Sequence, residues 1–306
     1  MLNKLFHTLA AQLSRGSRRP AQILASGLAG LIYALYRHSP YQGFIEGNIR
    51  AALPQAKAPQ LARQHLRLLL WAILDLLRFQ RFLSDPRVPP EVLISGWEHL
   101  EAAQAHGQGV ILVSAHFGCW ELIPASVSLS GLPVTVLVQK PALDVFDQLF
   151  REFRALAGVR TVNNDSLAGL RPILRALQRN EAVGLVIDQH GESRRLQGNF
   201  FGHTVSLPDG PAWLARRTGA RIVPVLIRWR GSRHVLEFFA PLASPTSSET
   251  DPETDFKADQ QLMQTIYAWL ETQIRRYPEN WLWSYNRWDK FPCRHCQSSP
   301  FQNQAG

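Results

Sequence analysis

An α/β fold with a mostly parallel central sheet and helices on both faces is the architecture that the sequence predicts. From about residue 91 onward, short apolar runs alternate with segments of helical periodicity, which is typical of β-α-β units. Several of these runs are apolar throughout, as expected of strands covered on both faces of a sheet. With 306 residues, 45% hydrophobic and 19% charged, the chain can bury a large core and is not a disordered protein.

Residues 1–85 are predicted to form a helical, membrane-associated region. The run between Arg19 and Arg37 carries no charge and is slightly shorter than the ~20 apolar residues that cross a bilayer. It is a short tilted span, a helix lying in the interface or a core helix, and the flanking arginines favour the membrane. A short helix follows within 40–54. A long amphipathic helix over 57–84 is either an ordinary surface helix or one that lies on lipid.

Residues 86–292 are predicted to form the α/β domain. Its expected strands are 91–94, 109–114, 134–139, 160–162, 182–187, 222–228 and 235–239. The expected helices cover about 120–130, 144–157, 166–180, 208–219 and 256–277. A polar loop near 244–255 precedes the last helix, and 293–306 reads as a flexible tail.

The charge and the cysteine content narrow the classes of partner. A net charge of +9 and a pI near 9.9 favour anionic lipid or an acidic carrier protein. The basic residues are scattered and no nucleic-acid-binding motif is present, so nucleic acid is not an expected partner. Three cysteines cannot form a disulfide framework. Cys293 and Cys296 have the spacing of half a zinc site with no second half, so no metal is predicted.

The stretch GVILVSAHFGCWE, residues 109–121, ends a buried strand in an imidazole, a glycine and a carboxylate. His116 and Glu121 would lie ~140° apart on a regular helix, so a turn at 117–118 must separate them. A helix starting within 119–123 then places Glu121 in its first turn, from where it reaches the imidazole. A carboxylate that holds one ring nitrogen leaves the other as a base. The pair therefore predicts activation of a hydroxyl.

Direct attack by that hydroxyl, without a covalent enzyme intermediate, is the simplest expected chemistry. Ser114 lies inside the strand and lacks a G-x-S-x-G elbow, and Cys119 reads as a small packing residue. Asp188 directly follows the strand predicted at 182–187. Ligands gather at the carboxyl ends of strands in such sheets, so Asp188 is expected on the same edge as His116.

The H-x4-E block resembles the bacterial lipid A biosynthesis acyltransferases, the lauroyl/myristoyl transferase family, within the H-x4-D/E glycerolipid acyltransferase superfamily. The similarity runs in order over about residues 20–292. It includes NIRAALP, the block from IDQHGES to ARIVPV, and the ending NWLWSYNRWDKFP. The resemblance implies a glycerolipid-acyltransferase-like fold. It also implies transfer of a fatty acyl group from acyl carrier protein, or from coenzyme A, to a glycolipid hydroxyl.

The resemblance assigns His116 as the base and Glu121 as its orienting partner. Asp188 and Gln189 match the family's D-Q block, and Arg154 falls where a family arginine sits. At position 140 the chain has lysine where the family commonly has arginine, which keeps the charge but loses the bidentate fork. Backbone amides near Gly118 are expected to stabilise the oxyanion. The expected substrate-binding residues are Gly118, Lys140, Arg154, Asp188, Gln189, Phe201 and Gly202.

Phe201 and Gly202 line an acyl or acceptor groove in this interpretation; the alternative is a plain turn with core rings. We therefore expect a membrane-associated O-acyltransferase at the cytoplasmic face of the inner membrane, with a lipid A precursor as acceptor. No cofactor is expected beyond the donor thioester of acyl carrier protein or coenzyme A. The alternatives are another phospholipid or glycolipid acceptor, a thioesterase, or a non-enzymatic basic membrane-binding protein.

Overall fold

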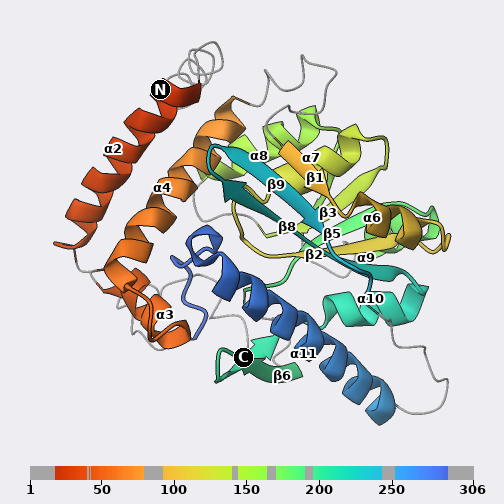
Figure 1. Ribbon diagram of the computed structural model, residues 1–306. Coiled ribbons are helices and arrows are strands. Elements are labelled where there is room, and N and C mark those ends of the chain that lie inside the picture. The colour runs from red at the N-terminus through yellow and green to blue at the C-terminus, as the bar shows by residue number, and fades with distance from the viewer. Residues whose placement is uncertain are drawn as a thin grey trace.

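The computed structural model describes residues 18–39, 41, 43–78, 92–139, 144–163, 170–189, 196–242 and 252–288. In this part of the chain a seven-stranded sheet lies at the centre, with helices around it (Figure 1). The strand order is β1-β9-β8-β2-β5-β3-β4. The strands are β1 (Val92–Ser95), β2 (Val110–Ser114), β3 (Val134–Val138), β4 (Arg160–Asn163), β5 (Ala182–Val186), β8 (Arg221–Arg230) and β9 (Arg233–Phe238).

The sheet is mostly parallel, as predicted. Strands β8, β2, β5, β3 and β4 run in one direction. Strand β9 runs antiparallel to β8, and the edge strand β1 runs parallel to β9, so β9 and β1 are reversed relative to the other five strands. The reversal comes from a two-residue turn between β8 and β9, where Gly231 has a φ of 62°, a conformation that glycine adopts without steric cost.

Side-chain alternation along β2 divides the core into two layers. Val110 and Leu112 pack among the helices on one face, and Ile111 and Val113 pack among those on the other. The first face is covered by α6 (Trp97–Gln104), α7 (Leu122–Leu129) and α8 (Asp144–Leu156). The second face is covered by α9 (Leu170–Gln178), α10 (Gly210–Thr218) and α11 (Pro252–Arg276). This arrangement confirms the prediction of helices on both faces.

The N-terminal helices α2 (Arg18–Tyr36), α3 (Phe44–Ala52) and α4 (Ala58–Leu77) extend the same core. Tyr33, Ile49 and Leu61 belong to one hydrophobic cluster, whereas Ala72 and Leu76 belong to the other. Helix α2 lies alongside α4 at the edge of the molecule (Figure 1). None of the helices in the described ranges is long and apolar enough to cross a membrane.

Some elements were not predicted, and some predictions fall outside the described residues. Helix α6, the short helix η2 (Pro278–Asn280) and the hairpin of β6 (Leu196–Phe200) and β7 (His203–Leu207) were missed. The predicted boundary near residue 85 and the tail at 293–306 lie outside the described residues. The predicted loop at 244–255 lies outside them up to residue 251, and its last four residues form the start of α11 instead.

Candidate active site

The loop after β2 makes a tight turn against β8. Gly118 has a φ of +58°, and a Cβ added there would lie 2.2 Å from the Ile227 carbonyl oxygen. Only glycine fits this combination of backbone conformation and close approach. The predicted turn at 117–118 is therefore confirmed, and helix α7 begins at Leu122, with Glu121 as its N-cap.

His116 and Asp188 occupy matching positions on adjacent strands. Ser114 pairs in register with Val186 across β2 and β5, and His116 and Asp188 each stand two positions beyond the end of their strand. His116 Nδ1 lies 2.8 Å from Asp188 Oδ1. The His116 backbone N–H donates to Asp188 Oδ2 at 3.0 Å. The structure thus confirms that both side chains meet at the carboxyl edge of the sheet.

Asp188 is a buried carboxylate with three hydrogen-bond donors. Its residue is 3% exposed, and Trp281 Nε1 donates to Oδ2 at 2.8 Å. Burial by itself raises the pKa of Asp188, but the charge of His116 and the hydrogen bonds from His116 and Trp281 outweigh burial and hold the pKa below its ordinary value. An ionised carboxylate can only accept a hydrogen bond, so in the neutral imidazole the ring proton lies on Nδ1 and Nε2 keeps its lone pair.

The predicted contact between His116 and Glu121 is wrong. Glu121 is 4% exposed and binds the guanidinium of Arg154 from helix α8, with Nε 2.8 Å from Oε2 and Nη2 2.5 Å from Oε1. A planar guanidinium matches both carboxylate oxygens at once, so Glu121 turns toward α8, and Asp188 serves the imidazole instead. Arg154 is buried in this ion pair, where the sequence predicted a substrate contact.

Gly118 also has a different partner from the predicted one. Its N–H donates to the Asn280 carbonyl oxygen at 2.8 Å, so the Gly118 amide itself is already bonded. The expectation that amides near Gly118 stabilise the oxyanion stays a prediction for its neighbours. Leu282 N–H donates to the His116 carbonyl at 3.0 Å, and Phe117 and Trp281 form an antiparallel bridge between these two bonds. The loop that carries His116 is therefore paired with residues 280–282.

Trp281 is the residue at this site that the sequence interpretation missed. It belongs to the block NWLWSYNRWDKFP, which was noted for family resemblance but not for chemistry. A signal was available, because a tryptophan donor is expected to find an acceptor when buried. The block NIRAALP contributes too, since the Asn48 side-chain amide donates to the carbonyls of Trp283 and Tyr285, each at 2.9 Å.

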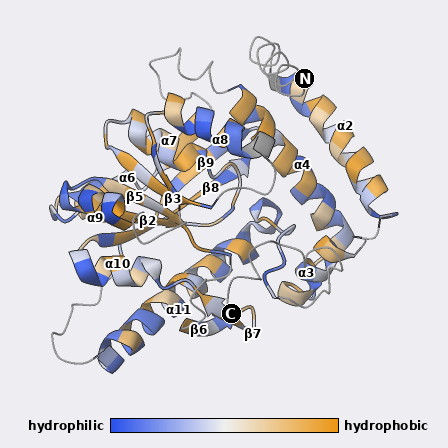
Figure 2. Cartoon of the chain, turned by 180° about the vertical axis from the view of Figure 1, so that it is seen from behind, coloured by the Kyte–Doolittle hydropathy of each residue, from blue (hydrophilic) through white to orange (hydrophobic). Residues whose placement is uncertain are grey.

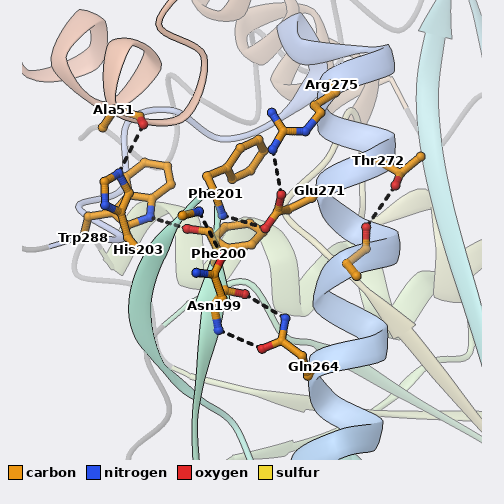
Figure 3. A network of polar contacts seen from close by, with 12 residues as sticks. Ala51, Asn199, Phe200, Phe201, His203, Gln264, Glu271, Thr272, Arg275 and Trp288 are labelled. Carbon is orange, nitrogen blue, oxygen red and sulfur yellow. Dashed lines mark hydrogen bonds and ion pairs between the residues drawn. The ribbon is translucent and has the colours of Figure 1, made fainter.

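Phe201 and Gly202 form the turn between β6 and β7, and Figure 3 shows Phe201 next to Arg275 and Glu271 of α11. Phe201 is buried, with its ring 4.8 Å from Phe200 and under the Arg275 guanidinium at 4.6 Å. Gly202 is exposed, and its N–H donates to Asn199 Oδ1 at 2.9 Å. The structure favours a turn with core rings over the groove that was the other interpretation.

Of the remaining predicted site residues, one lies next to Asp188 in sequence and one is not described. Gln189 is half-buried beside Asp188, and Lys140 lies outside the described residues. Trp120 packs edge-on against the His116 ring at 5.0 Å. Within the described ranges, no three His, Cys, Asp or Glu side chains gather as a metal site requires.

Comparison of the sequence with known proteins identifies its family. Residues 20–290 match the family described as bacterial lipid A biosynthesis acyltransferase. The chain belongs to this family.

The chain is also similar to two mycobacterial proteins named phosphatidylinositol mannoside acyltransferase. The relative from Mycobacterium tuberculosis is 28% identical over 136 residues, which are 43% of this chain and 42% of the relative. The relative from Mycolicibacterium smegmatis is 24% identical over 195 residues, which are 62% of this chain and 60% of the relative. The alignments therefore span about half of the relatives' lengths.

Proposed function

We propose that this protein is an O-acyltransferase that moves a fatty acyl group from a thioester to a hydroxyl of a glycolipid. The observation that carries the proposal is the His116–Asp188 pair at the carboxyl edge of the sheet, with Nδ1 bonded to a buried carboxylate. Such a pair is an oriented base for a hydroxyl. Membership of an acyltransferase family supports acyl transfer as the reaction.

The reaction needs one proton to move twice. His116 Nε2 takes the proton of the acceptor hydroxyl while the oxygen attacks the thioester carbonyl carbon. Asp188 stabilises the imidazolium that forms, because its carboxylate is buried and 2.8 Å from Nδ1. The tetrahedral intermediate then collapses, the new C–O ester bond remains, the C–S bond breaks, and the imidazolium returns its proton to the leaving thiolate.

The acceptor is proposed as a glycolipid, with a lipid A precursor as the first candidate. The family description supports lipid A, whereas the named relatives act on phosphatidylinositol mannosides. The donor is proposed as acyl carrier protein or coenzyme A, with no further cofactor. A net charge of +9 suits an acidic carrier protein and anionic lipid alike.

Membrane attachment through α2 is part of the proposal. The face of α2 that turns away from α4 exposes large apolar side chains, and hydrophobic residues recur along this helix (Figure 2). The exposed fractions are 72% for Ile23, 73% for Leu24, 50% for Leu28, 56% for Leu31 and 64% for Leu35. Exposed Arg19 and Arg37 flank this row, as in helices that lie in the headgroup region of anionic membranes. We place the catalytic domain on the cytoplasmic face of the inner membrane.

Acyl transfer is tested with purified protein, acyl carrier protein or coenzyme A thioesters, and candidate glycolipids. We expect an acylated glycolipid by mass spectrometry with the wild type and none with His116→Ala, at an unchanged circular dichroism spectrum. Release of free fatty acid with no dependence on any glycolipid would show a thioesterase instead. Lipids from a deletion strain identify the acceptor, because the missing acyl chain marks it.

Membrane attachment is tested by flotation with vesicles that contain phosphatidylglycerol. A Leu24→Glu, Leu31→Glu variant removes two apolar contacts from the exposed face, each worth roughly 1–2 kcal/mol on insertion. We expect at least a tenfold loss of vesicle binding at unchanged thermal stability. The matched control is Leu156→Glu, at a leucine of α8 that is 49% exposed. Equal binding by both variants would refute attachment through α2.

A further inference from the structure

The C-terminal segment brings one more side chain into the catalytic pair. The bonds Gly118 N–H to Asn280 O and Leu282 N–H to His116 O lie on either side of Trp281. They fix the Trp281 backbone against the loop that carries His116. Asp188 therefore lies between the His116 ring and the Trp281 indole, and the pairing of the two backbone segments holds both of these residues in place.

The Trp281 indole is held in one orientation. Its residue is 2% exposed, and its ring packs edge-on against Trp283 at 4.7 Å, Phe200 at 5.8 Å and Trp288 at 5.8 Å. Buried His65 from α4 is hydrogen-bonded to the Trp281 backbone. With its ring packed on these sides, the indole N–H points at one acceptor, Asp188 Oδ2, at 2.8 Å.

We propose that Trp281 is a positioning residue for the proposed transfer reaction, holding one oxygen of Asp188 so that the other faces the His116 ring. A carboxylate can rotate about its Cβ–Cγ bond and exchange its oxygens. Two donors at Oδ2, the indole and the His116 backbone N–H, prevent this rotation and leave Oδ1 for Nδ1. The inference rests on the proposed function of His116 as the base.

Other polar groups near Asp188 are already engaged. Tyr267 donates its hydroxyl hydrogen to the Ile187 carbonyl, and burial raises the pKa of Tyr267 to about 12. Arg287 Nη2 donates to the Tyr267 hydroxyl at 3.2 Å and to the Ser206 carbonyl at 2.7 Å. These three bonds go to acceptors other than Asp188, so the bond from the Trp281 indole to Oδ2 stays in place beside them.

The chain offers matched controls for deleting one indole N–H. Trp281 donates to Asp188, whereas Trp283 donates to the Pro278 carbonyl at 2.6 Å and Trp288 to the Phe200 carbonyl at 3.3 Å. All three rings are buried in the same cluster. The variants Trp281→Phe, Trp283→Phe and Trp288→Phe therefore remove similar packing and one donor each, and only the first touches the catalytic pair.

We expect Trp281→Phe to lower kcat 10–100-fold with KM for donor and acceptor within twofold. The carboxylate loses a donor, so the pair takes up its proton more readily, and the acidic midpoint of the pH–rate profile moves to higher pH. Trp283→Phe and Trp288→Phe are expected to keep kcat within threefold and the midpoint unchanged. Loss of activity that follows thermal stability across all three variants would overturn the inference.

A second variant separates hydrogen bonding from packing. Trp281→His keeps a ring N–H, but its polar ring fills less space than the ring of phenylalanine. The Trp281→His variant is therefore expected to be less stable than Trp281→Phe and yet more active. The opposite order of activity would overturn the inference. The ¹⁵N spectrum of the His116 ring gives a readout without turnover. If the wild type transfers no acyl group, the proposed function fails, while a shift of the His116 signals in Trp281→Phe alone would still support positioning.

Discussion

Replacing Asp188 with asparagine tests the hydrogen-bond pattern around His116 most directly. Asp188 Oδ2 accepts two donors, the His116 backbone N–H at 3.0 Å and Trp281 Nε1 at 2.8 Å. Asparagine has a single acceptor oxygen, and these two donors hold it at the Oδ2 position. Its NH₂ group then faces His116 Nδ1, where Oδ1 stands at 2.8 Å in the wild type. The imidazole must accept at Nδ1, and its proton moves to Nε2.

An imidazole with its proton on Nε2 cannot take a proton from a hydroxyl. Tautomer reversal of this kind lowers kcat by about 10⁴ in a serine protease triad. We expect Asp188→Asn to lower kcat by roughly 10³–10⁴, or about 4–5.5 kcal/mol of activation free energy at 1.36 kcal/mol per tenfold. The backbone is expected to keep its conformation, because both donors at Oδ2 retain an acceptor.

The assay is acyl transfer at saturating donor, together with the ¹⁵N shifts of the His116 ring, which report the tautomer without substrate. Glu121→Gln is the comparison variant. Since Glu121 binds Arg154, this variant is expected to lose stability and to keep the tautomer. The assignment of Asp188 would be refuted if Asp188→Asn were fully active while a folded Glu121→Gln variant showed the reversed tautomer. That result would restore the His116–Glu121 pairing expected from the H-x4-E spacing.

Two further predictions concern stability. Gly118→Ala is expected to lower the free energy of unfolding by roughly 2–4 kcal/mol, because its Cβ would lie 2.2 Å from the Ile227 carbonyl oxygen. Gly202→Ala meets no atom within 4 Å and is expected to lower it by about 1–2 kcal/mol. Equal losses of stability in thermal unfolding would contradict the close-approach argument. Burial lowers the pKa of His65 to about 4, so the unfolded chain binds a proton there before the folded chain does. Between the ordinary value of 6.5 and about 4, stability is expected to fall with falling pH by about 1.4 kcal/mol per unit; urea titrations at several pH values should show a shallower fall for His65→Gln.

The strands of the central sheet were predictable because neighbouring residues in the sequence show their pattern of apolar side chains. All seven strands of the central sheet were expected within a few residues of their observed bounds. For the buried inner strands the reason is that an apolar run covered on both faces can be recognised without knowing its neighbours; the edge strands β1 and β4 are mostly exposed. The β6–β7 hairpin was missed because Gln197, Gly198 and Asn199 interrupt the apolar pattern of β6. Its edge is instead bonded to α11, where the Gln264 side chain bonds both backbone groups of Asn199, at 2.7 and 3.0 Å.

The sequence alone determined the fold class, the tight turn at 117–118, and the positions of His116 and Asp188 beyond their strands, because each depends on residues close together in the chain. Tertiary structure decided which carboxylate meets the imidazole. The order of strands in the sheet makes β2 and β5 neighbours, and α8 presents Arg154 to Glu121. It also decided that a tryptophan 93 positions from Asp188 bonds its carboxylate. Hydrogen-bond partners far apart in sequence depend on how strands and helices pack, which spacing along the chain does not encode.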